Sequence, residues 1–270
     1  MPSETGGEFT WGSSTATDAS GKGQDPRRTR LNPPLPTVAC LHHLDQPFLG
    51  HAEAPLRAAG LAIEEYDVAR GAALPELDDV DGLISFGGAQ SAVDLEAEPA
   101  LRAEAGLLAQ AVARDLPVLG LCLGAQLLAR GLGARVRRAP GRTVAWLRLE
   151  RLPGADGDPL VGTLPPLVPA LHWNEDVFDL PPGAVELLGP RLEGVEAFRA
   201  GRRAYGFQFH AEVTPSVLDR WYADYGSWLA QAGVAERDAR AADAANERAQ
   251  ADVAQRLFTA FAGLVGERGA

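Results

Sequence analysis

The sequence predicts an α/β protein with three layers: a mostly parallel sheet, helices on both of its faces, and a more antiparallel C-terminal half. Short apolar runs alternate with amphipathic helical stretches in the first half of the chain, as in right-handed β-α-β units. The run Val118–Leu121 is apolar at every position, which is typical of a strand buried on both faces. Residues 134–210 hold short candidate strands without long helices between them, which predicts the antiparallel part.

Each element of the first half follows from its hydrophobic period and its end signals. We expect strands at residues 36–41, 61–66, 83–86 and 118–121, and helices at residues 51–59, 99–114 and 125–132. The first helix is followed by Gly60 and the last by Gly133, in the position where glycine commonly ends a helix. In such a flavodoxin-like sheet the site lies beyond the carboxyl ends of the strands, where Gly87, Gly88 and Cys122 fall.

The second half is expected to contain strands at residues 144–149, 184–188, 195–198 and 204–210. Thr214 then forms an N-cap and Pro215 occupies the first position of a helix that ends near Gly233. The segment from residue 235 to about 263 is rich in Ala, Arg, Asp and Glu. We expect it to be a helix that packs through Val253, Leu257 and Phe261.

Composition limits the classes of protein that the chain can represent. Its 270 residues are 46% hydrophobic and 23% charged, as in a globular protein. Residues 1–34 have few large apolar side chains and predict a disordered tail, which leaves residues 35–270 as the folded domain. The net charge of −11 argues against nucleic acid as a partner.

Localisation and cofactors follow from what the composition lacks. We find no apolar membrane span and no signal core, and the two cysteines, Cys40 and Cys122, fit the cytoplasm better than a disulfide framework. His42, His43 and His51 lack partners at metal-ligand spacing, so neither a metal nor a cofactor is expected.

Cys122 is the first candidate catalytic residue. It follows a strand, precedes a helix, and has Gly120 and Gly124 two residues away on either side, so that the pattern is G-x-C-x-G. An isolated cysteine is usually a small buried hydrophobe, which is how we interpret Cys40. The flanking glycines set Cys122 apart, because they permit a sharp turn that presents the thiol at a helix N-terminus, where the helix dipole favours an anion.

His210 and Glu212 are candidates for a general base and its orienting carboxylate. Residues two apart on a strand share a face, so the expected strand would point both side chains the same way. A carboxylate can then hold one imidazole nitrogen while the other faces a nucleophile, as in a catalytic triad. Alone, the pair is a weak signal of a catalytic site. Combined with the Cys122 turn and with Gly87-Gly88, it becomes a strong one.

These motifs together resemble the class I, triad-type glutamine amidotransferases. Residues 119–126 (LGLCLGAQ) resemble the nucleophile motif of that family, residues 205–213 (YGFQFHAEV) its His-x-Glu motif, and residues 85–88 (SFGG) its oxyanion loop. The resemblance spans residues 36–230. It is strongest to stand-alone members similar to the amidotransferase domain of GMP synthase, which share a segment like residues 172–181.

The resemblance implies a role for each matching residue. Cys122 would attack the side-chain amide of glutamine, and His210, oriented by Glu212, would move the protons. The oxyanion would be held by the N–H of Gly88, in the Gly87-Gly88 loop, and by the N–H of Leu123, which follows Cys122. Water would then release glutamate from a γ-glutamyl thioester.

Substrate contacts are also implied for Gln126, His172, Trp173 and Asp176. Gln126, one turn into the helix, would contact glutamine from the side. The other three lie in what the sequence predicts to be a loop beside the site.

Three departures from the family pattern concern the loops. Ala211 stands where proline is usual between His and Glu, and Ala89 where proline often follows Gly-Gly. Asn174-Glu175-Asp176 replaces a common His-Gly-Asp, so the contacts of that segment with glutamine or a partner are left open.

Three functions remain open from the sequence. The first is an amidotransferase that supplies ammonia to a separate synthetase or ligase subunit. The second is a self-sufficient hydrolase of γ-glutamyl amides or peptides, and the third is a non-catalytic binding module. The presence of Cys122, His210 and Glu212 argues against the third.

Overall fold

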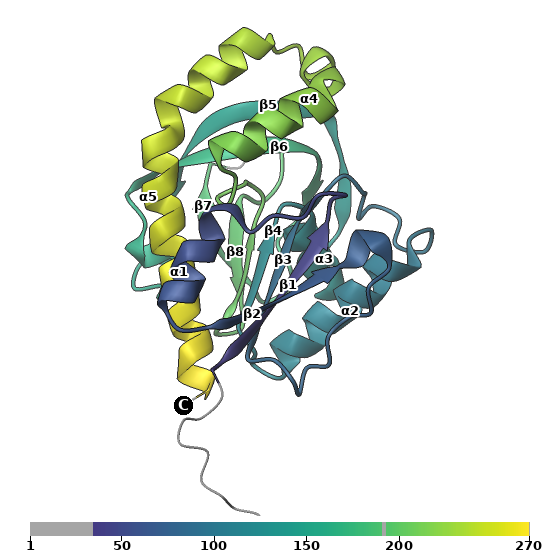
Figure 1. Cartoon of the computed structure of the whole chain (residues 1–270), viewed down its shortest axis with the longest axis vertical. Coiled ribbons are helices and arrows are strands. Elements are labelled where there is room, and N and C mark those ends of the chain that lie inside the picture. The colour runs from purple at the N-terminus through teal and green to yellow at the C-terminus, as the bar shows by residue number, and fades with distance from the viewer. Residues whose placement is uncertain (1–34, 191–192, 270) are drawn as a thin grey trace, which may run out of the picture. The chain divides into compact units, whose positions relative to one another are not determined.

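A computed structural model describes residues 35–190 and 193–269, which build one nine-stranded mixed sheet (Figure 1). Five strands are parallel neighbours, and four antiparallel strands extend the sheet from β9. The predicted α/β class, with its antiparallel C-terminal half, is confirmed. The strands, in spatial order, are β2 (Ala62–Asp67), β1 (Thr37–His43), β3 (Gly82–Gly88), β4 (Val118–Leu121), β9 (Ala204–Phe207), β8 (Ala197–Ala200), β7 (Val185–Gly189), β5 (Val136–Arg151) and β6 (Leu167–Phe178).

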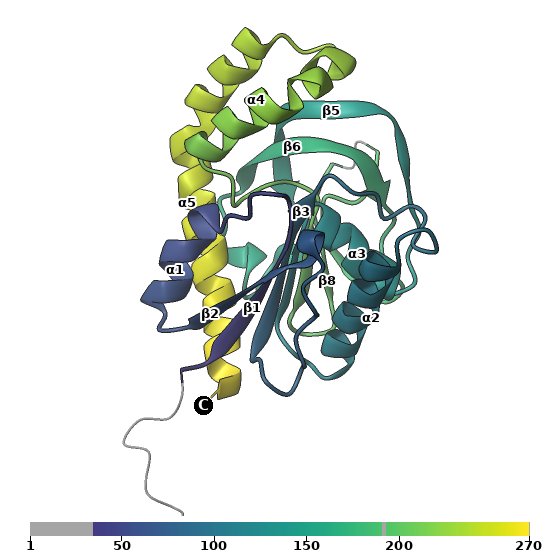
Figure 2. The same ribbon diagram turned by 45° about the vertical axis from the view of Figure 1, so that its right-hand side comes forward.

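Helices cover both faces of the parallel strands (Figures 1 and 2). Helices α1 (Glu53–Ala58) and α5 (Glu236–Gly269) lie on one face, and α2 (Pro99–Ala113) and α3 (Leu123–Gly131) on the other. Because successive side chains along a strand point to opposite faces of the sheet, they pack alternately against the helices of one face and of the other. Within residues 35–190 and 193–269, four short 3-10 turns complete the connections: Gly50–Ala52, Val68–Arg70, Pro153–Ala155 and Val161–Thr163.

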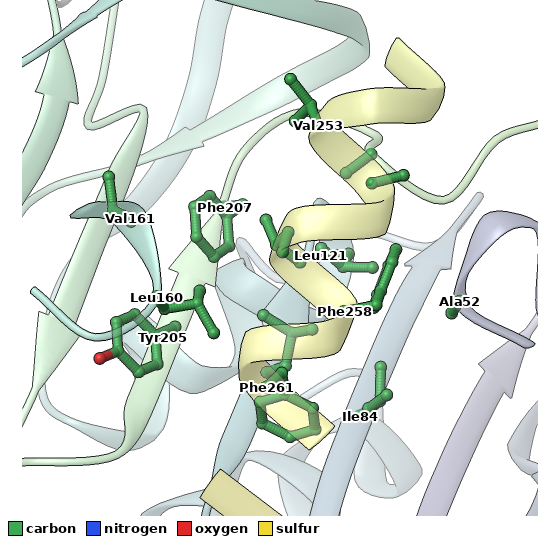
Figure 3. Close-up of a cluster of buried hydrophobic side chains, with 14 of the residues drawn as sticks. Ala52, Ile84, Leu121, Leu160, Val161, Tyr205, Phe207, Val253, Phe258 and Phe261 are labelled. Atoms are coloured by element: carbon green, nitrogen blue, oxygen red, sulfur yellow. The ribbon is translucent and has the colours of Figure 1, made fainter. Parts of the chain in front are cut away.

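Helix α5 supplies much of the larger core (Figure 3). Val253, Leu257 and Phe261 are each at most 1% exposed, as the sequence predicted, and Phe258 is fully buried with them. Their neighbours in the cluster include Ile84, Leu121 and Phe207 from three parallel strands. This packing fixes α5 on the sheet. The helix carries a residue that lies 40 positions after the candidate base and donates a hydrogen bond to the carbonyl of that base.

Helix α4 (Pro215–Ala232) packs on β5 and β6 through a third apolar cluster. The hydroxyl of Thr214 accepts a hydrogen bond from the N–H of Val217, and Gly233 ends the helix at φ 69°, so both predicted end signals are confirmed. Tyr225 has non-helical φ and ψ inside the helix, where the chain kinks. None of the helices in the two described stretches is long and apolar enough to cross a membrane.

Three expectations about local structure were wrong. Residues 172–176 were expected to be a loop, yet they belong to β6, because pairing with β5 extends along them. β5 itself is longer than predicted and continues through Pro140-Gly141 by a register shift. β9 ends at Phe207, so His210 and Glu212 lie beyond it. The tail predicted for residues 1–34 lies outside the described residues.

Candidate active site

Cys122 sits on the sharp turn between β4 and α3. Its φ of 49° and ψ of −106° are a strained combination for a residue with a side chain, and its N–H donates to the carbonyl of Phe207 at 2.8 Å. Strain of this kind persists only where the surroundings enforce it. Here β9 and the start of α3 fix the backbone and place the thiol at the carboxyl end of β4.

The flanking glycines are required by close backbone approach. A Cβ on Gly120 would lie 2.6 Å from the carbonyl oxygen of Gly124, and one on Gly124 would lie 2.0 Å from the carbonyl oxygen of Ser85. Both positions therefore exclude any side chain, which agrees with the steric reason for predicting the G-x-C-x-G turn.

His210 and Glu212 are hydrogen-bonded to each other. The Nδ1 atom of His210 lies 2.8 Å from Oε1 of Glu212, and both side chains are almost fully buried. This bond occupies Nδ1 and leaves Nε2 of the imidazole without a bond to Glu212, while Cys122 acts electrostatically on the ring. A Cβ on Gly87 would fall 2.7 Å from Cε1 of His210 and 3.6 Å from Cβ of Cys122, so the Gly87-Gly88 loop borders both residues.

The segment that carries His210 is fixed by neighbours rather than by a strand ladder. The N–H of His210 donates to the carbonyl of Leu171 on β6 at 2.9 Å, and the N–H of His51 donates to the carbonyl of Glu212 at 2.8 Å. Gln250 on α5 donates from Nε2 to the carbonyls of His210 (3.1 Å) and Val213 (2.8 Å). Three separate elements thus hold the backbone that the sequence analysis assigned to a strand.

The electrostatics of the pair favour a charged imidazole. Burial by itself lowers the pKa of His210, but the carboxylate of Glu212 and the sulfur of Cys122 outweigh burial and raise the pKa to about 10. An imidazolium between a carboxylate and a sulfur can stabilise a thiolate and later donate a proton.

A cavity that is open to solvent lies beside Cys122. Leu123 is the first residue of α3, so its N–H has no acceptor within the helix, and its side chain contacts the backbone of Gly88. The two predicted oxyanion donors therefore belong to adjoining segments. The cavity lining is polar on the other side, where it is formed by Gln126, Asn174, Glu175 and Asp176.

The predicted substrate-binding residues separate into two groups. Gln126 lines the cavity and donates from Nε2 to the carbonyl of Asp176 at 3.0 Å. The Asp176 carboxylate also lines it, accepting from Ser91 and pairing with Arg138. His172 lies elsewhere: it is 3% exposed, its Nε2 is 3.2 Å from Oε2 of Glu196, and it lines neither cavity that reaches the site.

Asn174 is a site residue that the sequence left open. Its Nδ2 donates to the carbonyl of Asp176 at 3.2 Å, while its buried Oδ1 has no hydrogen-bond partner among the described residues. An unpaired acceptor in a cavity beside the nucleophile is suited to an ammonium group. Glu175, beside it, is held by ion pairs with Arg138 and Arg142.

A buried polar group beside the Gly87-Gly88 loop was also missed. Glu104 on α2 accepts a hydrogen bond from Ser85 on β3 at 2.7 Å, and its other oxygen lies 2.7 Å from Nε2 of His43 on β1. All three side chains are at most 2% exposed, and the Cβ of His43 lies against Gly88. Their chain positions are too far apart for sequence spacing to reveal the contact.

Comparison with known proteins agrees with this geometry. The model of the family "Glutamine amidotransferase class-I" matches residues 56–225, so the chain belongs to that family. It is 31% identical over 164 residues to the putative glutamine amidotransferase-like protein YfeJ of Salmonella typhimurium, covering 59% of this chain and 69% of the relative. It is 37% identical over 142 residues to one subunit of the glutamine-hydrolysing GMP synthase of Haloarcula marismortui, covering 52% of this chain and 68% of that subunit.

Solved structures show the same fold. A glutamine amidotransferase of Thermotoga maritima superposes with a TM-score of 0.75 at 26% identity, covering 85% of this chain and 98% of the other. A glutamine amidotransferase of Methylobacillus flagellatus gives a TM-score of 0.74 at 26% identity, covering 86% and 96%.

Proposed function

We propose that this protein hydrolyses the side-chain amide of glutamine through Cys122, His210 and Glu212. The observation that carries the proposal is the strained turn at Cys122 together with an imidazole that bonds Glu212 through Nδ1 and interacts electrostatically with the sulfur of Cys122. Cys40 offers no alternative nucleophile, since it is fully buried and burial raises the pKa of its thiol. Two unpaired cysteines also support the cytoplasm as the compartment.

The reaction proceeds by acyl transfer to sulfur. The sulfur of Cys122 attacks the amide carbon, the C–N bond breaks, and His210 donates its proton to the departing ammonia. Water, deprotonated by His210, then attacks the γ-glutamyl thioester, which releases glutamate and restores the thiol. The N–H groups of Gly88 and Leu123 hold the oxyanion in both steps, and each such donor contributes about 3 kcal/mol.

The polar cavity is the proposed binding site for the glutamyl part. Gln126, Asn174 and Asp176 line it, and the unpaired Oδ1 of Asn174 is the proposed acceptor for the substrate ammonium group. We leave His172 out of this set because it lies beside Glu196 rather than in the cavity.

Ammonia release from glutamine by the purified chain tests this function. Wild type and Cys122→Ala are compared by coupling ammonia to glutamate dehydrogenase, with Cys40→Ala as the matched control. We expect Cys122→Ala to abolish release and Cys40→Ala to retain it. Full activity in Cys122→Ala would refute the proposed nucleophile.

A separate acceptor-activating protein is the proposed recipient of the ammonia. The support is a relative that is itself one subunit of a glutamine-hydrolysing synthase. We therefore expect slow hydrolysis by the chain alone and faster hydrolysis with a synthetase-type partner. The Gly87-Gly88 loop offers a physical route, because a peptide between glycines can turn its N–H toward or away from the oxyanion at little cost.

A self-sufficient hydrolase of γ-glutamyl amides is the second candidate. A second, aromatic cavity at His210 favours it, since an aromatic lining suits a substituted amine better than ammonia. Turnover at about 10 s⁻¹ by the chain alone, an ordinary enzyme rate, would decide for this candidate.

A further inference from the structure

An aromatic cavity that is open to solvent adjoins the cavity at Cys122. The two share Gly88, Ala89, Trp173 and Trp228 in their linings, so they meet at the oxyanion loop. We define the aromatic cavity by Leu44, Trp173, His210, Trp221, Tyr225 and Trp228.

The aromatic lining is held rigidly by contacts between its rings. Trp221 packs edge-on against His210 (ring centroids 4.9 Å apart) and against Trp173 (5.5 Å). The guanidinium of Arg142 lies 4.1 Å from the ring centre of Trp228 and supports it from outside the lining. Tyr225 enters at the kink in α4, so an irregularity of that helix shapes this wall.

The position of His210 assigns this cavity to the leaving group. When a thiol cleaves an amide, the imidazole that took the thiol proton donates it to the departing nitrogen. A substituent on that nitrogen therefore extends from the reacting carbon toward the imidazole. His210 lines the aromatic cavity and not the polar one, so such a substituent enters the aromatic cavity.

The charge of the lining selects among amines. Among the described residues, no carboxylate, lysine or arginine lines the aromatic cavity, and its one basic group is His210, whose pKa is raised. Aromatic rings by themselves attract cations, but an imidazolium in the same wall repels them. An uncharged, flat amine is the group that this lining accommodates.

We propose that the aromatic cavity binds the amine portion of an N-aryl γ-glutamyl amide, whose hydrolysis yields glutamate and a free aromatic amine. This inference rests on the proposed Cys122 chemistry and names its substrate class. The C–N bond of the anilide breaks as the bond from sulfur to carbon forms, and the proton of His210 goes to the aryl nitrogen. Water then cleaves the thioester, so no further reactant is needed.

Binding to a variant that cannot turn over tests the inference separately from the chemistry. In Cys122→Ala, calorimetry should show γ-glutamylanilide binding roughly tenfold tighter than glutamine, because its ring packs among aromatic side chains. Adding Leu44→Ala or Tyr225→Ala should remove about fivefold or more of that preference. The matched controls Leu167→Ala and Tyr66→Ala, on β6 and the edge strand β2, should leave it unchanged.

Turnover supplies the second readout. Wild type should release aniline from γ-glutamylanilide, and Leu44→Ala and Tyr225→Ala should lower kcat/KM for the anilide relative to glutamine by a similar factor. Because the comparison is a ratio between variants, the intrinsic reactivity of the anilide cancels. Equal binding of the two amides, or a ratio that the cavity variants do not change, would overturn the inference while leaving glutamine hydrolysis by Cys122 intact. Hydrolysis that survives Cys122→Ala would instead overturn the proposed function.

Discussion

Substituting Gln250 by leucine should impair catalysis although the residue is far from Cys122 in sequence and does not line the polar cavity. Its Nε2 donates to the carbonyls of His210 and Val213, at 3.1 and 2.8 Å, and only 4% of the residue is exposed. Leucine is close to glutamine in size but donates no hydrogen bond. The variant therefore removes both hydrogen bonds that α5 makes to the segment carrying the candidate base, while keeping the packing of α5.

The expected magnitude follows from the two carbonyls left without a donor. Each buried unsatisfied acceptor costs about 1–3 kcal/mol, and the added apolar burial of leucine offsets part of this, which leaves a net loss of about 2–4 kcal/mol. In a domain of this size that corresponds to a fall in Tm of roughly 5–15 °C. Since a shift of about 1 Å at a catalytic group can cost about 10² in rate, we expect kcat to fall about tenfold or more.

The assay pairs thermal unfolding with ammonia release measured well below both melting temperatures. Gln255→Leu is the matched control, because Gln255 lies on the same helix, is exposed, and bonds Thr259 on its own helix. That variant should keep both Tm and kcat. An unchanged kcat in Gln250→Leu, whatever its Tm, would refute the claim that α5 positions His210.

Further outcomes follow from the same geometry. Glu212→Gln should lower the pKa of His210, so the alkaline limb of the pH profile of kcat moves to lower pH. The loss of rate should be milder than in His210→Ala. An alkaline limb that does not move would remove Glu212 from the triad. Because the folded pKa of His210 lies above its unfolded value of about 6.5, its charge stabilises the fold below that pH, and the contribution disappears as pH rises toward about 10. Gly124→Ala should destabilise the fold by about 3 kcal/mol or more in urea unfolding, since its Cβ would lie 2.0 Å from a carbonyl oxygen. The control Gly106→Ala, whose Cβ would lie in open space, should be neutral or stabilising. Equal effects of the two substitutions would contradict the steric argument. Deletion of residues 1–30 should leave Tm unchanged, because the segment is poor in large apolar side chains, and a large fall would show that it packs on the domain.

Local signals were sufficient where a short stretch determines its own structure. The apolar run at β4, the glycines around Cys122 and the cap at Thr214 act over a few residues, and the structure has each as expected. The partnership of His210 with Glu212 was also expected, but for a reason that does not hold, since both residues lie beyond β9. Their placement depends on hydrogen bonds from other elements.

Long-range contacts explain what the sequence could not show. The polar residues of β6 have the pattern of a loop, and only pairing with β5 makes them a strand. Gln250 is 40 positions from His210 and lies in a helix whose pattern indicated packing alone. Glu104 joins Ser85 and His43 across three elements. Such contacts carry no periodic signal, because spacing within one element does not determine them.

Covalent labelling tests the central claim, that Cys122 is the nucleophile of an amide-cleaving site. The glutamine analogue diazo-oxo-norleucine is incubated with the native protein, and the modified residue is located by peptide mass spectrometry, with excess glutamine as competitor. We predict labelling at Cys122 that glutamine suppresses and that His210→Ala slows, and no labelling of Cys40, which is fully buried. Labelling of Cys40 with Cys122 untouched would contradict the account.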